Sequence, residues 1–108
     1  MLIEWAESAD NDLAAILDFF IRREDDATGK RIVSRLIRSV SILEAQPLAG
    51  KPGRIDGTRE LVPRKLPYVL VYQVPLPDLV EIVRVIHTSR LFPESLFEED
   101  EETPAKTP

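Results

Sequence analysis

The chain has 108 residues, which is the size of one domain with a core of its own. It has no cysteine, which excludes disulfides and thiolate metal sites, and one histidine, so that any metal site would have to consist mostly of carboxylates. The sequence shows no metal-binding or phosphate-binding motif, and we expect no metal or cofactor. The net charge of −5 is uneven: Lys and Arg number 6 against 9 Asp and Glu in residues 1–50, 7 against 4 in 51–92, and 1 against 6 in 93–108. An acidic chain can therefore still turn a basic face to an anionic partner.

The first half of the chain predicts a strand and two helices. Residues 2–5 are apolar, and Ser8 is a candidate cap for the helix that follows. An acidic break contains Asp26, the candidate cap of the second helix, which ends before Pro47. Apolar positions repeat with helical spacing on both helices. The predicted core side chains are Leu13, Ile16, Leu17, Phe20, Val33, Leu36, Ile37 and Val40.

The second half predicts strands over 58–62, 67–74 and 79–86, after a loop rich in glycine and proline. The fold class is therefore α+β, with an N-terminal strand and a helical hairpin packed on a small, mostly antiparallel four-stranded sheet. We expect one domain over residues 1–97. The acidic segment 98–108 is expected to be disordered, because it cannot bury enough apolar area.

No apolar run approaches the roughly 18 residues of a membrane span, and the first residues lack a secretory signal. We therefore expect a cytoplasmic protein with no membrane partner.

Basic residues of the second half gather in the predicted strands and at their ends. We expect them on the sheet face away from the helices, either as a solvated surface or as a site for nucleic acid phosphates or an acidic protein segment. His87, at the end of the central strand, is a candidate general base or a structural side chain bonded to a carbonyl. The cluster comprises Lys51, Arg54, Arg59, Arg64, Lys65, Arg84, His87 and Arg90.

Five motifs, taken in this order and spacing, resemble the RelE/ParE family of toxins from type II toxin–antitoxin modules. The resemblance extends to Pro93 and implies the fold given above. The motifs are Ala9-x-x-Asp12-Leu13-x-x-Ile16, Leu43-x-x-x-Pro47 with Gly50, Gly57-Thr58-Arg59-Glu60-Leu61, Pro67-Tyr68-Val69-Leu70-Val71-Tyr72, and Ile82-Val83-Arg84-Val85-Ile86-His87-x-x-Arg90.

The resemblance implies two alternative activities. In the ribosome-dependent mRNA endonucleases of the family, basic residues act on the scissile phosphate, and Arg59, His87 and Arg90 would take these roles. However, Val69 stands where an arginine often follows the tyrosine, and an apolar side chain cannot balance phosphate charge. The Gly-Thr-Arg-Glu-Leu and Pro-Tyr pattern is more similar to the ParE branch, whose members poison DNA gyrase without cutting RNA.

The first hypothesis is therefore a ParE-like toxin of a plasmid-stabilising module that acts on DNA gyrase and binds its cognate antitoxin in a hetero-oligomer. The alternatives are the endonuclease, with ribosome and mRNA as partners, and a non-toxic relic that binds only antitoxin. Antitoxin acids are expected to pair with Arg59, Arg84 and Arg90. The full predicted set for the target or antitoxin is Lys51, Arg54, Arg59, Arg64, Arg84, His87 and Arg90.

Overall fold

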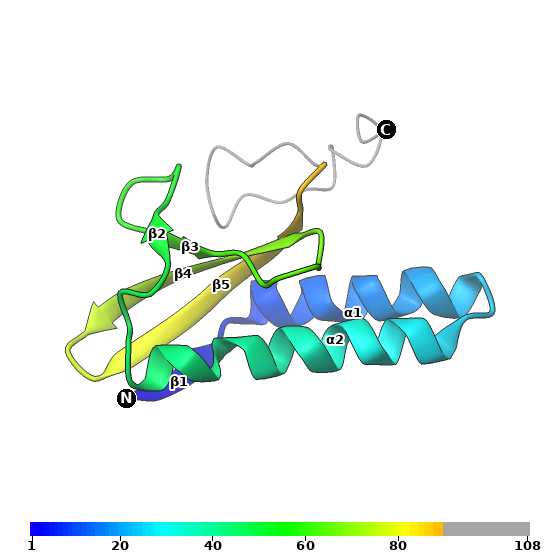
Figure 1. The fold of residues 1–108 in the computed structure, drawn as a ribbon, viewed down its shortest axis with the longest axis horizontal. Helices are drawn as coiled ribbons and strands as arrows, with labels where there is room; N and C mark the ends of the chain where they lie inside the picture. The colour runs from blue at the N-terminus through cyan, green and yellow to red at the C-terminus, as the bar shows by residue number, and fades with distance from the viewer. Residues whose placement is uncertain (90–108) are drawn as a thin grey trace.

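The computed structural model describes residues 1–89, and Arg90 and the predicted tail at 98–108 lie outside them. One sheet in the strand order β1-β5-β4-β3-β2 packs against two helices (Figure 1). Strand β1 runs parallel to β5, and the other neighbours are antiparallel. The elements are β1 (Leu2–Trp5), α1 (Glu7–Arg22), α2 (Asp26–Ser39), the 3₁₀ helix η1 (Val40–Glu44), β2 (Lys51–Pro52), β3 (Arg59–Leu61), β4 (Tyr68–Leu76) and β5 (Leu79–His87).

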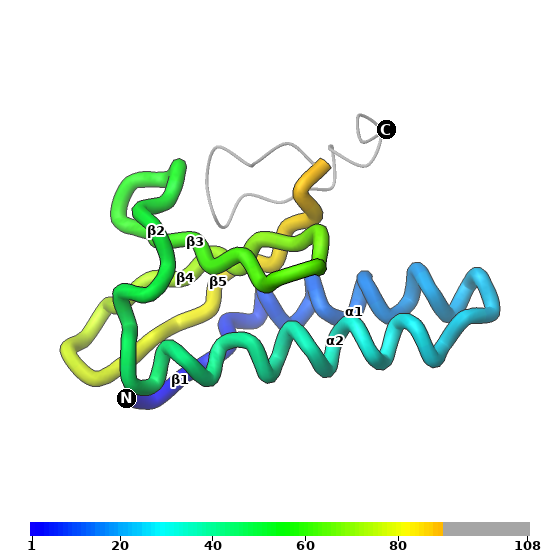
Figure 2. Tube along the Cα trace, viewed as in Figure 1, coloured from blue at the N-terminus to red at the C-terminus, as the bar shows by residue number. Residues whose placement is uncertain are grey.

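Helices α1 and α2 form an antiparallel hairpin whose turn projects beyond the sheet (Figures 1 and 2). The helices approach closely where Gly29 meets α1. A Cβ atom at Gly29 would lie 2.9 Å from the Cβ of Phe20 and 3.1 Å from Cδ1 of Leu17. The first distance is shorter than Cβ atoms tolerate, so a side chain here would force Phe20 and α1 to shift. The hairpin therefore depends on a glycine at this position.

The main core lies between the helices and the sheet, as the apolar spacing predicts. Leu36 of α2 and Leu43 of η1 are fully buried against Leu70 and Ile82. The prediction for Ile37 was wrong, because this side chain remains 46% exposed. Ile32, at another position on α2, packs against the core instead. Leu17 and Phe20, also predicted for the core, are half-buried and belong to neither apolar cluster.

The face of the sheet away from the helices carries a second, smaller apolar cluster. Val69 and Val71 of β4 and Val83 and Ile86 of β5 are at most 3% exposed there. A β-bulge shifts the register, since Val71 pairs with Arg84 whereas the next residue of β4 pairs with Ile82.

Three local predictions need correction. The sheet has five strands rather than four, because Lys51–Pro52 forms the two-residue strand β2, too short to show a period. Helix α1 begins after Ala6, so Ser8 is not its cap. The cap of α2 is Asp25 rather than Asp26, and its carboxylate accepts the backbone N–H of Thr28 at 3.4 Å. Within the described residues no helix is long and apolar enough to cross a membrane.

Candidate functional site

Arg84, one of the predicted binding residues, forms a buried ion pair with Asp12 of α1. Its Nε lies 2.8 Å from Oδ2 of Asp12, and its Nη2 lies 3.2 Å from Oδ1. The two side chains are only 6% and 14% exposed. Asp12 also accepts the backbone N–H of Val85 at 2.8 Å. A buried guanidinium held by a bidentate carboxylate belongs to the fold, and we assign Arg84 a structural role.

Asp12 and Ser8, one turn apart on α1, take the place of a neighbouring strand along β5. Strand β1 pairs only as far as Ile82, whose carbonyl oxygen accepts the backbone N–H of Ala6. Beyond that point the Ser8 hydroxyl donates to the carbonyl oxygen of Val83 at 2.6 Å, and Asp12 accepts from Val85. Sequence reasoning missed this arrangement, although polar residues at i and i+4 beside an apolar stripe were a usable signal.

The guanidinium of Arg54 is also held within the domain. The carboxylate of Glu60 on β3 is 1% exposed and lies 3.3 Å from both Nε and Nη2 of Arg54. It also accepts the backbone N–H of Arg54 at 2.9 Å. This pair fixes the loop between β2 and β3, and it lies on the same face as Arg84, since Glu60 and Arg84 both pair with Val71.

Arg59 closes the loop that precedes β2. Its Nη2 and Nε donate to the carbonyl oxygen of Gly50 at 2.6 and 3.0 Å, and Nη2 also reaches that of Leu48 at 3.3 Å. The buried hydroxyl of Tyr72 donates to the carbonyl of Pro47 at 2.7 Å and accepts the N–H of Gly50 at 2.9 Å. Arg59 therefore satisfies backbone carbonyls that would otherwise lack partners.

His87 lies at the end of β5, half-buried, with its ring edge-on to Tyr68 at a centroid distance of 5.1 Å. Its Nδ1 accepts the backbone N–H of Ser89 at 3.1 Å and lies 2.8 Å from the Ser89 hydroxyl oxygen. A neutral ring with Nδ1 as acceptor carries its proton on Nε2. His87 is thus bonded to the turn after β5, and not to a carbonyl as one of the two predictions had it.

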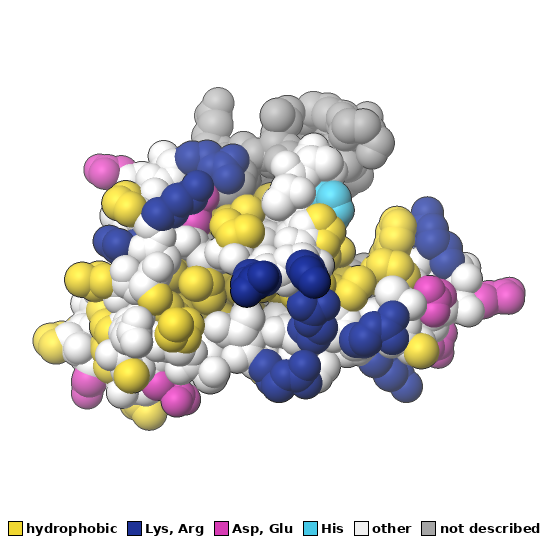
Figure 3. Space-filling model, viewed as in Figure 1, with side chains coloured by type: hydrophobic (Ala, Val, Ile, Leu, Met, Phe, Trp, Pro, Cys, Tyr) yellow, Lys and Arg dark blue, Asp and Glu magenta, His cyan; other side chains and the backbone are white. Residues whose placement is uncertain are grey.

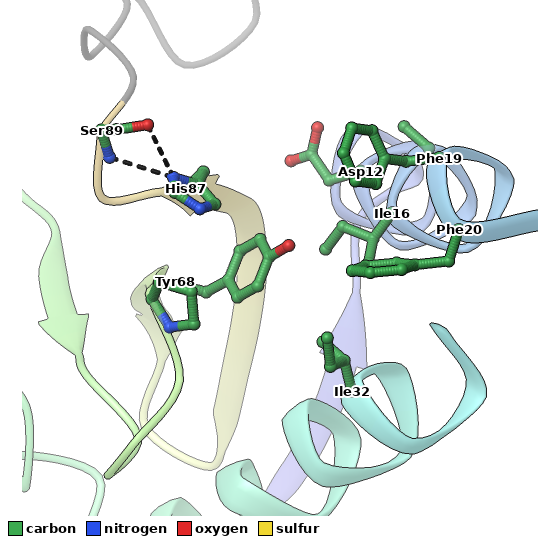
Figure 4. Close-up of a pocket in the computed structure, with 10 residues that line it drawn as sticks. Asp12, Ile16, Phe19, Phe20, Ile32, Tyr68, His87 and Ser89 are labelled. Carbon is green, nitrogen blue, oxygen red and sulfur yellow. Dashed lines mark hydrogen bonds between the residues drawn. The ribbon is translucent and has the colours of Figure 1, made fainter. Parts of the chain in front are cut away.

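A cavity of about 370 Å³ opens between the end of the sheet and the projecting hairpin (Figure 4). The rings of Tyr68 and His87 lie on its sheet side, and Phe19, Phe20 and Ile32 lie on its helix side. Apolar side chains dominate the lining, with Asp12 and Ser89 at its polar end. We call it the hairpin pocket; it is lined by Asp12, Ala15, Ile16, Phe19, Phe20, Ile32, Pro67, Tyr68, His87 and Ser89.

The structure separates the residues proposed for the endonuclease. Arg59 pairs with Tyr72, and His87 pairs with Tyr68, four residues away on β4. Four residues of strand span about 13 Å, and β3 and β5 lie on opposite sides of β4. Arg59 also points its guanidinium at the loop of Gly50. The two side chains therefore do not converge on one phosphate.

A second group of cations lies beside the hairpin pocket, and it joins three arginines of α2, which the prediction left out, to the predicted residues Arg64 and Lys65. Helix α2 places Arg31, Arg35 and Arg38 at i, i+4 and i+7, and Arg35 donates to the carbonyl oxygen of Arg64 at 3.1 Å. Figure 3 shows Lys and Arg side chains gathered in the middle of this face, next to exposed apolar side chains. We call this group the basic strip; it consists of Arg31, Arg35, Arg38, Arg64 and Lys65.

Two further predicted residues, Lys51 and Arg64, are exposed. Lys51 lies on the edge strand β2, and Arg64 belongs to the basic strip. Over residues 1–89, no three His, Cys, Asp or Glu side chains are grouped so as to hold a metal ion.

The family model described as "ParE toxin of type II toxin-antitoxin system, parDE" matches residues 3–92. The chain belongs to the ParE toxin family. A curated relative, "Putative toxin Y4kP" of Sinorhizobium fredii, is 36% identical over 77 residues, which cover 71% of this chain and 78% of that protein. Membership confirms the resemblance of the motifs to the family.

Two solved structures share the fold. One is the chromosomal ParDE toxin–antitoxin system from P. aeruginosa, with a TM-score of 0.72 and 25% identity, covering 81% of this chain and 95% of that one. The other is the RelBE2 toxin–antitoxin complex of Mycobacterium tuberculosis, with a TM-score of 0.58 and 25% identity, covering 80% and 95%. These similarities confirm the predicted α+β class, with two helices on an open, mostly antiparallel sheet.

Proposed function

We propose that this ParE-family chain arrests growth by binding DNA gyrase in the cytoplasm, and that a cognate antitoxin neutralises it in a hetero-oligomer. In this proposal the chain is a binding protein rather than an enzyme. Family membership supports the toxin role, and both structural neighbours come from toxin–antitoxin systems.

The observation that carries the choice of target is the separation of Arg59 from His87. A nuclease needs its charged groups preorganised around one scissile phosphate. Here Arg59 is bonded to the carbonyls of Gly50 and Leu48, and Arg84 to Asp12. This use of both guanidinium groups supports a toxin that acts by binding.

The endonuclease alternative rests on His87. The ring is half-buried beside an open pocket, and its Nδ1 bond to Ser89 orients it. A histidine held in this way could exchange a proton with a ribose hydroxyl. This alternative predicts that His87→Gln abolishes toxicity without loss of folding.

The test pairs two assays with the same purified chain. We expect inhibition of DNA supercoiling by gyrase at stoichiometric amounts, and intact mRNA in a cell-free translation reaction. The His87→Gln variant is the matched control, and it should inhibit gyrase as the natural chain does. Cleaved mRNA that requires His87 would establish the endonuclease instead, whereas no effect in either assay would identify a non-toxic relic.

Neutralisation is tested separately in cells. Expression of the chain alone should stop growth, and co-expression of the protein encoded beside it should restore growth. Continued arrest despite stable co-expression would contradict that part of the proposal.

A further inference from the structure

We propose that residues 90–97 of this chain pack on the sheet face away from the helices and close it. The segment has the sequence Arg-Leu-Phe-Pro-Glu-Ser-Leu-Phe and directly follows the described residues. This packing is independent of the proposed function, because it needs neither gyrase nor an antitoxin. The face carries an apolar cluster that we call the far-face cluster; it consists of Val69, Val71, Val83 and Ile86.

The far-face cluster is buried more fully than its described neighbours explain. Its four side chains are at most 3% exposed, although both helices lie on the other face of the sheet (Figure 1). Among residues 1–89, the partly buried hydrophobic side chains that pack against the cluster are Ala6 and Ile55. A buried core side chain touches about 6–12 other residues. One methyl group and one isoleucine therefore cover too little area to exclude water from this face.

The two central strands have the sequence pattern of a sheet that is covered on both sides. A sheet with one solvated face alternates apolar and polar residues. In β4, however, Val69 and Val71 point away from the helices while Leu70 and Tyr72 point into the main core. Strand β5 likewise supplies apolar side chains to both clusters. The pattern predicts a second apolar layer over β4 and β5.

The segment after residue 89 has the composition of such a layer. Half of its eight residues are large apolar side chains, whereas residues 98–108 contain five acids and a single alanine. A phenylalanine buries about 150–250 Å², so two of them can cover a small cluster. The match to the family model also continues to residue 92. The apolar residues of the segment are Leu91, Phe92, Leu96 and Phe97.

The place where the sheet ends brings the segment within reach of the cluster. The backbone N–H of Thr88 donates to the carbonyl oxygen of Pro67 at 2.8 Å, so the pairing of β5 with β4 continues almost to the end of the described chain. From Ile86 back to Val83 the strand spans about 10 Å, and eight extended residues span about 26 Å. A segment attached so close to the cluster has a high effective concentration, which favours it over a separate partner.

The hairpin pocket is the competing site for the same apolar side chains, since Ser89 is among its lining residues. Exposure distinguishes the two sites. Phe19, which lines the pocket, is 47% exposed, whereas no member of the far-face cluster exceeds 3%. A covered face and an open pocket favour the far-face cluster as the place where the segment packs.

The experiment measures nuclear Overhauser effects in the full chain with isotope-labelled methyl groups. We expect contacts from the rings of Phe92 and Phe97 to the methyl groups of Val71, Val83 and Ile86. Contacts from both rings to the lining of the hairpin pocket instead would overturn the proposal, as would the absence of any contact to the cluster. A mixture of labelled and unlabelled chains tests a second copy as the occupant, and contacts found only between chains would also overturn it.

A pair of substitutions tests the same packing by thermal melting of the full chain. Phe92→Ser combined with Phe97→Ser should lower the melting temperature by at least about 10 °C and increase the binding of a dye for apolar surface. The matched control combines Glu98→Ser with Glu101→Ser, just beyond the segment, and should change the melting temperature by less than about 3 °C. An equal melting temperature in the two double variants would overturn the proposal. The contacts in the natural chain decide the question if the phenylalanine variant does not fold.

The result is separable from the test of the cellular target. A chain that inhibits gyrase but lacks these ring contacts would overturn this packing and leave the proposed function intact. A chain that shows the contacts but does not inhibit gyrase would do the reverse.

Discussion

Two groups of arginines in this domain differ in the partners that their guanidinium groups bind. On the sheet face away from the helices, Arg54 and Arg84 are each paired with a carboxylate. Arg59, which pairs with Tyr72 on the other face of β4, binds backbone carbonyls. In the basic strip beside the hairpin pocket, the bonds that Arg31 and Arg38 form within residues 1–89 go to hydroxyl groups of their own helix. The first group stabilises the sheet and its loops, whereas the second has no carboxylate partner among residues 1–89.

The difference follows from what surrounds each group. The carboxylate of Asp12 accepts hydrogen bonds from the buried guanidinium of Arg84 and from the backbone N–H of Val85. Without this carboxylate, both donors at the end of β5 would lose their partner. A charge taken out of water must be compensated in place, whereas a charge at a helix surface is solvated. The partner, a buried carboxylate or a backbone carbonyl, and not the density of basic residues, therefore distinguishes the first group of arginines from the second.

The largest expected effect is that of Asp12→Ala, which leaves Arg84 buried without its carboxylate. We expect a loss of about 3–5 kcal/mol in the free energy of unfolding, measured by urea denaturation. Asp18→Ala is the matched control, because Asp18 also pairs with an arginine but is 55% exposed; it should cost less than about 1 kcal/mol. Similar losses in both variants would abolish the distinction between the two groups.

Arg84→Glu belongs to the same test. Charge reversal there would place two carboxylates against each other, so we expect failure to fold. A folded Arg84→Glu variant with weakened antitoxin binding would return Arg84 to the binding surface.

The next largest loss of stability is expected from a substitution in the main core. Leu36→Ala removes a fully buried side chain and should cost about 2–5 kcal/mol. The neighbouring Ile37→Ala is the control, since Ile37 is 46% exposed. A loss below about 0.5 kcal/mol for Leu36→Ala would contradict the packing of α2.

A smaller loss is expected for Tyr72→Phe, which removes the hydroxyl that binds Pro47 and Gly50. Two buried backbone groups then lose a partner, and the cost is about 1–3 kcal/mol by thermal or urea unfolding. Limited proteolysis should show faster cleavage in the loop before β2. Unchanged proteolysis would mean that Arg59 alone holds this loop.

For the basic strip, Arg38→Ala should change the free energy of unfolding by less than about 0.5 kcal/mol. Its side chain bonds only to Ser34 and is exposed. The measurement is urea denaturation beside Asp12→Ala. A loss above about 2 kcal/mol would show that the strip belongs to the fold.

The smallest effect is expected from deletion of residues 98–108. Five of these residues are acids, and the segment has few apolar groups to bury. The melting temperature should stay within error. A clear drop would place the segment on the domain and move its boundary beyond residue 97.

Much of the fold could be predicted from local pattern. Helical spacing located α1 and α2, and alternation with β-branched residues located β4 and β5. The pattern could not show β2, which has only two residues, or choose between Asp25 and Asp26 as a cap. For the candidate site, the sequence correctly predicted basic residues and His87 in the strands and near their ends. It wrongly predicted that all of them share the sheet face away from the helices, since Arg59 lies on the face of Tyr72.

The sequence by itself determined the family, the α+β class and the supply of basic side chains, because these depend on spacing along the chain. Only the tertiary structure decided which of those side chains remain available. Register placed Glu60 and Arg84 on either side of Val71, and the close pairing of helices brought Asp12 to the edge of β5. Such pairings join residues up to 73 positions apart, so no local pattern encodes them.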